Sequence, residues 1–302
     1  MERLQYMIAR RQRRWCFLPS VPGGRPRITS SVRRGMTLIE LLLATTIVAM
    51  VFGTLAALAS GVRQAYEHTE AYGLTTQHAR VVLERIHRTA VEAVASDEFP
   101  GFIVVPREQS GHSFPEMLIV WSPRTFLGDP KPAQNPEGLP RYNEVVIFCP
   151  HPTIPSRLVE MTFPFVSNEV PPPDEMGRWQ AELEALIKGN YWATATLTDL
   201  LRTAAVTDNV TSTTRRLGAV RFSTRLRPSE AEWEDFLAGD LAWKELSWVQ
   251  GVYGADMGLR QNWVRIEVQL VAGVDEVATG DGAYQPVTFY DSAALYYELH
   301  RP

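Results

Sequence analysis

An uncharged run of 22 residues near the N-terminus, Leu41 to Val62, constrains this chain more than any other feature. In a helix that rises 1.5 Å per residue, roughly 20 apolar residues cross the hydrocarbon core of a bilayer. The nearest charged residues are Glu40 before the run and Arg63 after it. The run therefore predicts a transmembrane helix with sharply defined ends.

Charge is divided unevenly between the two sides of this run. Residues 1–35 hold nine arginines and one acidic residue, whereas residues 36–302 hold the other 21 basic and 33 acidic residues. Because basic residues beside an apolar span stay in the cytoplasm, the first segment predicts a cytoplasmic N-terminus. Binding to a phosphate backbone needs an excess of Lys and Arg, so the acidic remainder predicts no nucleic-acid partner.

Two ordinary explanations of the apolar run leave Glu40 unaccounted for. A secretory signal peptide has an apolar stretch of about 7–15 residues and small residues at its cleavage site. Ala57-Leu58-Ala59 supplies such a site before Ser60, but the run is long and begins with a carboxylate. An unprocessed anchor tolerates Glu40 poorly, because an unpaired charge in hydrocarbon costs roughly 2.5 kcal/mol or more.

The segment around Glu40 resembles the cleavage and methylation signal of type IV prepilins and pseudopilins. Arg33-Arg34 precede the sequence Gly35-Met36-Thr37-Leu38-Ile39-Glu40. The resemblance implies that prepilin peptidase cuts after Gly35 on the cytoplasmic side and N-methylates the new first residue, Met36. Glycine suits this position because the peptide must lie extended in the protease cleft without a side chain. The chain departs from the family pattern in having Met36 where phenylalanine is commoner, and in the length of its leader.

The same resemblance gives Glu40, the fifth residue of the mature chain, a role in assembly. It implies a salt bridge from Glu40 to the N-terminus of a neighbouring subunit. Such a pair would cancel two charges inside an apolar helix bundle, where either charge alone is expensive.

The implied fold is an α+β, pilin-like fold: a long N-terminal helix packed on an antiparallel β-rich head. Residues 1–35 form the cleaved leader, and residues 36–62 form the transmembrane or filament-core helix. Apolar or small residues continue at steps of three and four, which predicts an amphipathic continuation of the helix through residues 63–96. The head then covers residues 97–302.

Within the head, β-type runs and proline-rich breaks predict an antiparallel sheet with one helical insert, around residues 174–205. Ser229 and Glu232 form a capping-box pattern for a short helix through Leu237. The remaining runs predict strands at Phe102–Val105, Glu116–Trp121, Glu144–Cys149, Arg157–Phe163, Gly218–Arg227, Trp243–Val249, Trp263–Ala272 and Val287–His300.

The segment from Leu259 to Val268 is similar to the closing-strand region of J-type minor pseudopilins of type II secretion and of W-type minor pilins. The cysteines agree with this resemblance, since removal of the leader and its Cys16 leaves Cys149 without a disulfide partner. The resemblance therefore favours a minor subunit over a major pilin with a disulfide-closed loop.

The head contains no catalytic motif, so we expect no catalytic residue, no metal site and no cofactor. Cys149 is expected to be a buried structural thiol, and the histidines at 68, 78, 87, 112 and 151 have no ligand spacing. Acidic residues Asp275, Asp281 and Asp291 lie near Gly280 and Gly282, but their spacing matches no calcium loop. Tryptophans are expected in the core or at subunit interfaces: Trp121, Trp179, Trp233, Trp243, Trp248 and Trp263.

These observations predict a non-enzymatic minor pilin or pseudopilin in a type II secretion pseudopilus or type IV pilus. The implied partners are prepilin peptidase, other pilins in a helical filament, the inner-membrane assembly platform, and membrane lipid before assembly. The implied location is the bacterial inner membrane, crossed once, with the head in the periplasm or outside the cell. The alternative is a membrane-anchored exported binding module or enzyme unrelated to pili.

Overall fold

The computed structural model describes residues 35–109, 111–124, 129–207, 214–247, 257–271 and 286–300. The chain divides into two compact units, Met1–Ser60 and Gly61–Pro302. Among the described residues, α1 (Leu38–Val91) is long and apolar enough to cross a membrane. The rest of the described chain is a β-rich head, so the expected α+β class is confirmed.

Helix α1 ends earlier than its apolar periodicity predicts. The expected continuation through residue 96 is wrong, because the helix stops at Val91. The backbone N–H of Val94 donates to the carbonyl of Trp121, and that of Ser96 donates to the carbonyl of Phe99. Since each N–H has one partner, these bonds to the head replace the next helical turn.

A five-stranded antiparallel sheet forms the centre of the head, in the order β1-β2-β3-β4-β5. Neighbours in the sheet are neighbours in the chain, so the sheet is a meander. Its strands are β1 (Phe102–Gln109), β2 (His112–Trp121), β3 (Val145–Pro150), β4 (Leu158–Thr162) and β5 (Ala193–Thr198).

Both faces of this central sheet are buried, because alternate residues of its strands enter two different hydrophobic clusters. Phe102, Leu118 and Phe148 enter the first cluster, together with Val82 and Ile86 of α1. The residues that alternate with them, such as Ile103, Ile119 and Ile147, enter the second cluster. The central sheet therefore separates α1 from the layer on its other face.

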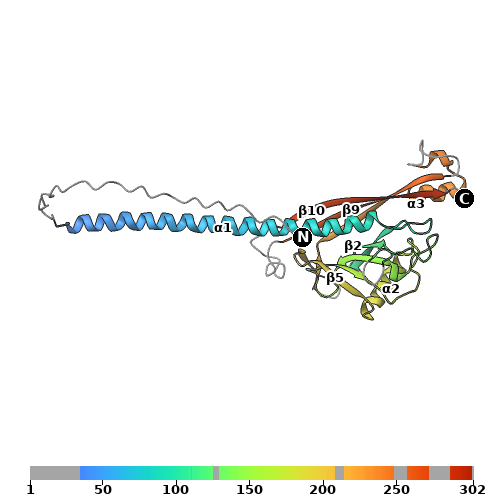
Figure 1. The fold of residues 1–302 in the computed structure, drawn as a ribbon, viewed down its shortest axis with the longest axis horizontal. Coiled ribbons are helices and arrows are strands. Elements are labelled where there is room, and N and C mark those ends of the chain that lie inside the picture. Colours follow the sequence, from blue (N-terminus) through green and yellow to red (C-terminus); the bar gives the residue numbers. More distant parts are fainter. Residues whose placement is uncertain are drawn as a thin grey trace, which may run out of the picture. The chain divides into compact units, whose positions relative to one another are not determined.

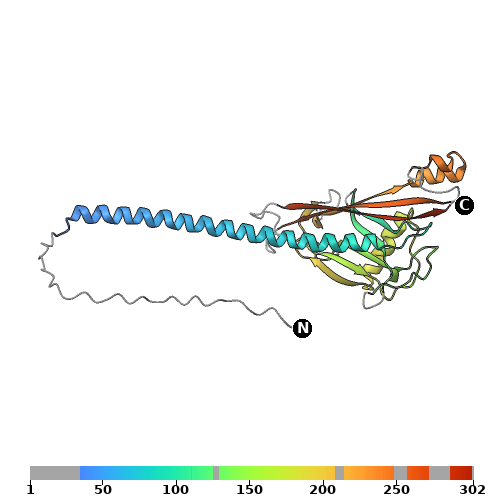
Figure 2. The same cartoon turned by 45° about the horizontal axis from the view of Figure 1, so that its top comes forward.

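A second antiparallel sheet, in the order β10-β9-β8, covers the first cluster from the opposite side. Its strands are β8 (Val220–Arg227), β9 (Met257–Leu270) and β10 (Val287–His300). Phe222, Ile266 and Leu295 from these strands are buried in the same cluster as α1. Within the second unit, α1 thus lies between the two sheets, as both views show (Figure 1, Figure 2).

Helix α2 (Met176–Lys188) covers the second face of the central sheet through Trp179 and Leu183. The helical insert expected around residues 174–205 is wrong in its second half, because β5 and β6 (Thr203–Thr207) occupy that part. The run Ala-Thr-Ala-Thr in β5 suits an edge strand, since β-branched threonine favours extended backbone and β4 supplies the hydrogen bonds. Strand β6 pairs with β7 (Thr214–Gly218) in a two-stranded sheet.

The segment after β8 confirms one prediction and corrects another. Ser229 caps α3 (Glu230–Ala238), and its side chain and that of Glu232 form the expected reciprocal capping box. The strand expected at Trp243–Val249 is wrong at its start, where residues Trp243–Glu245 form the 3-10 turn η2. Residues 248 and 249 lie outside the described part. At the end of the chain, β10 has the predicted bounds, Val287–His300.

Candidate functional site

The segment that resembles a processing signal lies at the start of α1 and is open to solvent. Gly35 and Met36 precede the helix, and the side chain of Met36 is 68% exposed. A Cβ atom added to Gly35 would meet no atom within 4 Å, and its φ lies outside the left-handed region. Nothing in the described fold of the chain therefore requires glycine at this position.

Glu40 closes the first turn of α1 together with Thr37. The backbone N–H of Thr37 donates to Glu40 Oε2 at 2.9 Å, and the Thr37 hydroxyl donates to the same oxygen at 3.0 Å. In return, the backbone N–H of Glu40 donates to Thr37 Oγ1 at 3.4 Å. This is the reciprocal arrangement of a capping box, and it satisfies N–H groups that a helix start leaves unpaired.

The capping bonds use only one oxygen of the Glu40 carboxylate. Both hydrogen bonds from Thr37 reach Oε2, and no bond to Oε1 is present among the described residues. A carboxylate has about four acceptor positions on its two oxygens. Glu40 can therefore cap its own helix and still accept a hydrogen bond from a cationic donor.

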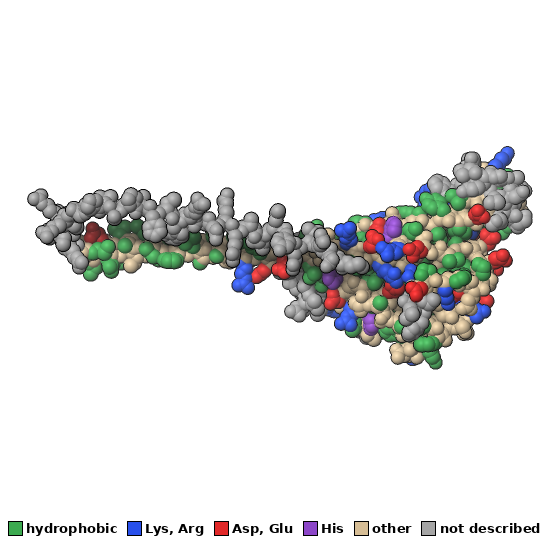
Figure 3. Space-filling view, in the orientation of Figure 1, with side chains coloured by type: hydrophobic (Ala, Val, Ile, Leu, Met, Phe, Trp, Pro, Cys, Tyr) green, Lys and Arg blue, Asp and Glu red, His purple; other side chains and the backbone are tan. Residues whose placement is uncertain are grey.

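The apolar run that follows exposes every side chain from Leu41 to Val62. Hydrophobic side chains follow this part of α1 in Figure 3, and the first charged pair beyond them is Arg63 with Glu67, 2.8 Å apart. The threonine hydroxyls within the run donate back to backbone carbonyls one turn earlier; these are Thr45, Thr46 and Thr54. The polar side chains of these three residues are thus satisfied inside the helix, which suits an apolar environment.

In the second unit, polar contacts fix α1 to both sheets. Arg85 binds Glu160 on β4 through two hydrogen bonds of 2.7 and 2.6 Å. His78 Nδ1 lies 3.0 Å from the hydroxyl of Thr198 on β5. These two contacts fix α1 on the central sheet, and one of them involves His78, for which the sequence predicted no ligand role.

On the other sheet, His87 Nδ1 lies 3.4 Å from Asp291 on β10. Asp291 belongs to the acidic group that the sequence placed near Gly280, but Asp275 and Asp281 lie outside the described residues. The described ranges contain no group of three or more His, Cys, Asp or Glu residues that could hold a metal ion.

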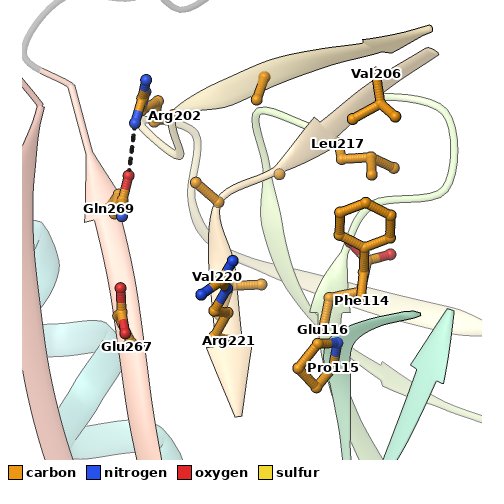
Figure 4. Close-up of a pocket in the computed structure, with 13 residues that line it drawn as sticks. Phe114, Pro115, Glu116, Arg202, Val206, Leu217, Val220, Arg221, Glu267 and Gln269 are labelled. Atoms are coloured by element: carbon orange, nitrogen blue, oxygen red, sulfur yellow. Dashed lines mark hydrogen bonds between the residues drawn. The ribbon is translucent and has the colours of Figure 1, made fainter. Parts of the chain in front are cut away.

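A pocket of about 250 Å³ lies where β2, the β6–β7 pair and the β8–β9 strands meet. Figure 4 shows Phe114, Leu217 and Val206 on one side of it, with Arg221 and Glu267 toward the three-stranded sheet. Arg202 donates to the side-chain oxygen of Gln269 at 2.9 Å near its edge. Its lining residues are Phe114, Pro115, Glu116, Arg202, Ala204, Val206, Leu217, Gly218, Ala219, Val220, Arg221, Glu267 and Gln269.

One carboxylate of this pocket, Glu116, is buried and was not singled out from the sequence. Its Oε1 lies 2.7 Å from Arg107 Nε but accepts no hydrogen bond. Burial raises the pKa of Glu116, and the nearby Arg107 charge opposes the rise. The contact between Arg107 and Glu116 results from the β1–β2 register, which no sequence motif predicts. The pocket lining contains no His, Cys, Ser or Lys, so Glu116 has no nucleophile there to activate.

The other reactive residues of the head are not brought together. Cys149 is fully buried, and burial raises the pKa of its thiol to about 12. The ring of His151 packs against Trp192, with centroids 5.5 Å apart, and its Nδ1 accepts from the N–H groups of Thr153 and Ile154. Burial lowers the pKa of His151, with Arg157 adding to the effect.

Three features of the described chain are thus candidates for a function: the exposed segment around Gly35, the Glu40 carboxylate and the exposed apolar helix. The described chain gives no reason for Gly35 or for the exposed apolar side chains, and the helix cap uses only one oxygen of Glu40. Comparison with protein-family models, curated proteins and solved structures finds no match to this chain.

Proposed function

We propose that this chain is a minor pilin or pseudopilin, a structural subunit that prepilin peptidase processes before assembly. The observation that carries the proposal is the position of Glu40: a carboxylate at the head of a fully exposed apolar helix, five residues after Gly35. A charge at that place is unfavourable for a plain anchor and useful for a subunit that pairs it on assembly.

Gly35 supports the same proposal, because the described fold gives no reason for it. Its Cβ position is open and its backbone is not left-handed. An extended peptide in a protease cleft would impose a requirement for glycine from outside the chain. Hydrolysis of the Gly35–Met36 peptide bond would leave Met36 as an N-terminal ammonium, which the peptidase then methylates.

Glu40 would next accept the N-terminal ammonium of a neighbouring subunit. Its Oε1 carries no hydrogen bond from the described residues, so the new contact need not break the cap formed with Thr37. In an apolar bundle the pair removes two isolated charges at once, and a charge-assisted hydrogen bond forms between them.

The exposed apolar helix has two successive environments in this scheme. Before assembly, lipid of the inner membrane covers Leu41–Val62, with the arginine-rich leader in the cytoplasm and the head outside. After assembly, helices of other pilins cover it in the filament, which an inner-membrane platform builds. In both states the apolar side chains of the helix are removed from water. This removal is the main favourable free-energy term for either environment compared with an exposed helix.

The alternative is an exported binding module or enzyme held by an anchor that only resembles a prepilin segment. The observation in its favour is the buried carboxylate of Glu116 in the pocket of Figure 4. Perturbed carboxylates occur in active sites, but ion pairs such as that with Arg107 perturb them as well.

Processing of glycine variants separates these functions. Gly35→Leu should abolish cleavage by prepilin peptidase, because the new side chain blocks the extended peptide. Gly53→Leu is the matched control, since a Cβ at Gly53 also meets no atom within 4 Å and the site lies inside the apolar run. Cleavage of both variants at the wild-type rate would contradict the proposal.

A second variant tests the role of Glu40 after cleavage. Glu40→Leu should be cut and methylated normally but should enter filaments at a strongly reduced level. Glu67→Leu, in the exposed pair with Arg63 beyond the apolar run, is the control and should assemble. Normal assembly of the Glu40→Leu variant would contradict the proposed salt bridge.

A further inference from the structure

The three-stranded sheet has one buried face and one open face. Val220, Phe222, Val264 and Ile266 are buried against α1, so the residues that alternate with them lie on the opposite face. The register of β8, β9 and β10 arranges that opposite face in four cross-strand rows. We call it the arginine face; its rows are Arg221–Glu267–Tyr290, Ser223–Arg265–Ser292, Arg225–Trp263–Ala294 and Arg227–Gln261–Tyr296.

The charge of the arginine face is opposite to that of the chain around it. The four rows hold four arginines and one glutamate, whereas residues 36–302 as a whole hold more acidic than basic residues. Arg221 and Arg225 are exposed, and neither has a salt-bridge partner among the described residues. Arg221 and Arg225 thus present positive charge that no salt bridge among the described residues neutralises.

Aromatic side chains lie between these arginines. Trp263 is in the middle strand with Arg225 directly opposite, while Tyr290 and Tyr296 on β10 are 56% and 52% exposed. The guanidinium of Arg265 lies over the Tyr290 ring, 5.1 Å from its centroid. Tryptophan, tyrosine and arginine are the residues that carry most of the binding energy in protein interfaces.

Contacts within the arginine face hold several of its side chains in place before any partner arrives. Gln261 donates to the Tyr296 hydroxyl at 2.8 Å, and Arg265 is stacked on Tyr290. Side chains that are already ordered lose less conformational entropy on binding. The surface is therefore built for contact at a low entropic cost.

The arginine face borders the pocket of about 250 Å³ described above. Arg221 and Glu267 belong both to its first row and to the lining of the pocket in Figure 4. The far wall of that pocket is apolar, with Phe114, Val206 and Leu217. A partner that covers the arginines can place an apolar side chain in this pocket, as interface anchors do.

We propose that the arginine face is a docking surface for an acidic patch on a different protein. Charge complementarity selects carboxylates as the groups that meet Arg221 and Arg225. A second copy is disfavoured, because the acidic excess of residues 36–302 makes two copies repel each other. A nucleic acid is disfavoured because the acidic excess of residues 36–302 repels a phosphate backbone.

Carbodiimide cross-linking of the full-length protein in its native membranes tests this inference. The reagent joins an amine to a carboxylate in direct contact, so Arg225→Lys places a reactive amine on the arginine face. We expect a cross-link from position 225 to an Asp or Glu of another protein, located by mass spectrometry. Arg215→Lys on β7, exposed and outside the face, is the matched control and should not form that link.

Two further variants, made in the Arg225→Lys background, separate docking from chance proximity. Arg221→Glu and Trp263→Ala should each reduce the cross-link by about tenfold or more, the effect expected of hot-spot residues. Amide exchange of β9 checks that both variants stay folded. An unchanged yield of the cross-link in both double variants would overturn the inference. The absence of any cross-link from Arg225→Lys alone would overturn it as well. A link to a second copy, or binding of oligothymidylate by the purified protein that Arg221→Glu abolishes, would overturn it in favour of those partners.

This inference stands on the head alone and does not require cleavage at Gly35. A protein that is never processed could still show the cross-link, and a processed protein could lack it. Failure of one proposal therefore leaves the other intact.

Discussion

The guanidinium of Arg85 on α1 holds the carboxylate of Glu160 on β4 through two hydrogen bonds, from Nε at 2.7 Å and from Nη2 at 2.6 Å. The two side chains are 33% and 11% exposed, so water screens the pair only in part. Paired hydrogen bonds of this kind fix orientation as well as distance. Arg85 thus sets how the second half of α1 lies on the central sheet.

A double-mutant cycle should show that this pair is coupled. With Arg85→Met and Glu160→Gln, we expect a coupling energy of about 1.5–3 kcal/mol, the range for hydrogen bonds to charged groups. Denaturant unfolding of the full chain in detergent measures it. The exposed pair Arg88–Glu84 on the same helix is the control and should give only about 0.3–0.5 kcal/mol. Equal coupling in the two pairs would contradict the assigned role of Arg85.

Packing of α1 against the two sheets should depend on Ile86, which is fully buried. Ile86→Ala should lower the free energy of unfolding by about 2–5 kcal/mol, because it removes buried apolar atoms and leaves a cavity. Val81→Ala on the exposed side of the same helix should change it by less than about 0.5 kcal/mol. Equal losses at both positions in denaturant unfolding would contradict the observed orientation of the helix.

The cap of α3 should make that helix sensitive to acid. The backbone N–H of Ser229 is the main cause of a lowered pKa at Glu232. Because the folded pKa lies below the unfolded one, the stabilisation is complete above the unfolded pKa and is lost as pH falls through the folded pKa. Amide exchange of α3 should report this loss, and Glu232→Gln should reduce its dependence on pH.

Two variants control that experiment. Glu234→Gln, two residues along the same helix, should leave the acid dependence in place. Ser229→Ala should destabilise α3 by about 1 kcal/mol at neutral pH through loss of the hydroxyl cap. Acid dependence that survives Glu232→Gln unchanged would rule out this capping carboxylate as its source.

Cys149 should resist alkylation while the protein is folded. Its thiol is fully buried, and burial raises its pKa to about 12, so little reactive thiolate forms near pH 8. In a Cys16→Ser precursor, Cys149 is the single thiol, and iodoacetamide should modify it roughly a hundredfold or more slowly than after unfolding in guanidinium. Rapid modification of the native protein would place Cys149 in an accessible site.

Elements with a clear local pattern were predictable from the sequence. The alternation along β9 and the capping box at Ser229 depend on residues close together in the chain, and both are present. The apolar run from Leu41 is likewise helical throughout. Here local pattern and final structure agree because no distant contact competes with them.

The errors occurred where contacts between distant residues decide the structure. Apolar periodicity continues past Val91, yet the N–H of Val94 is taken by the carbonyl of Trp121. In the run of alternating Ala and Thr in β5, threonine favours a strand and alanine does not, so pairing with β4 decides its structure.

The arginine face follows the same division between local and distant information. The alternating arginines of β8 are visible in the sequence, but their meeting with Trp263 and Tyr290 requires the register of three strands. The burial of Glu116 beside Arg107 similarly depends on a hairpin register that the sequence does not specify.

The proposed processing of the N-terminus is tested most directly by mass spectrometry of the membrane-extracted protein, with and without active prepilin peptidase. We expect an N-methylated terminus at Met36 when the peptidase is active, and an uncut leader with Gly35 still attached when it is absent. A terminus at Ser60, or an uncut chain in both cases, would contradict the proposed processing and leave an exported or anchored protein of another kind.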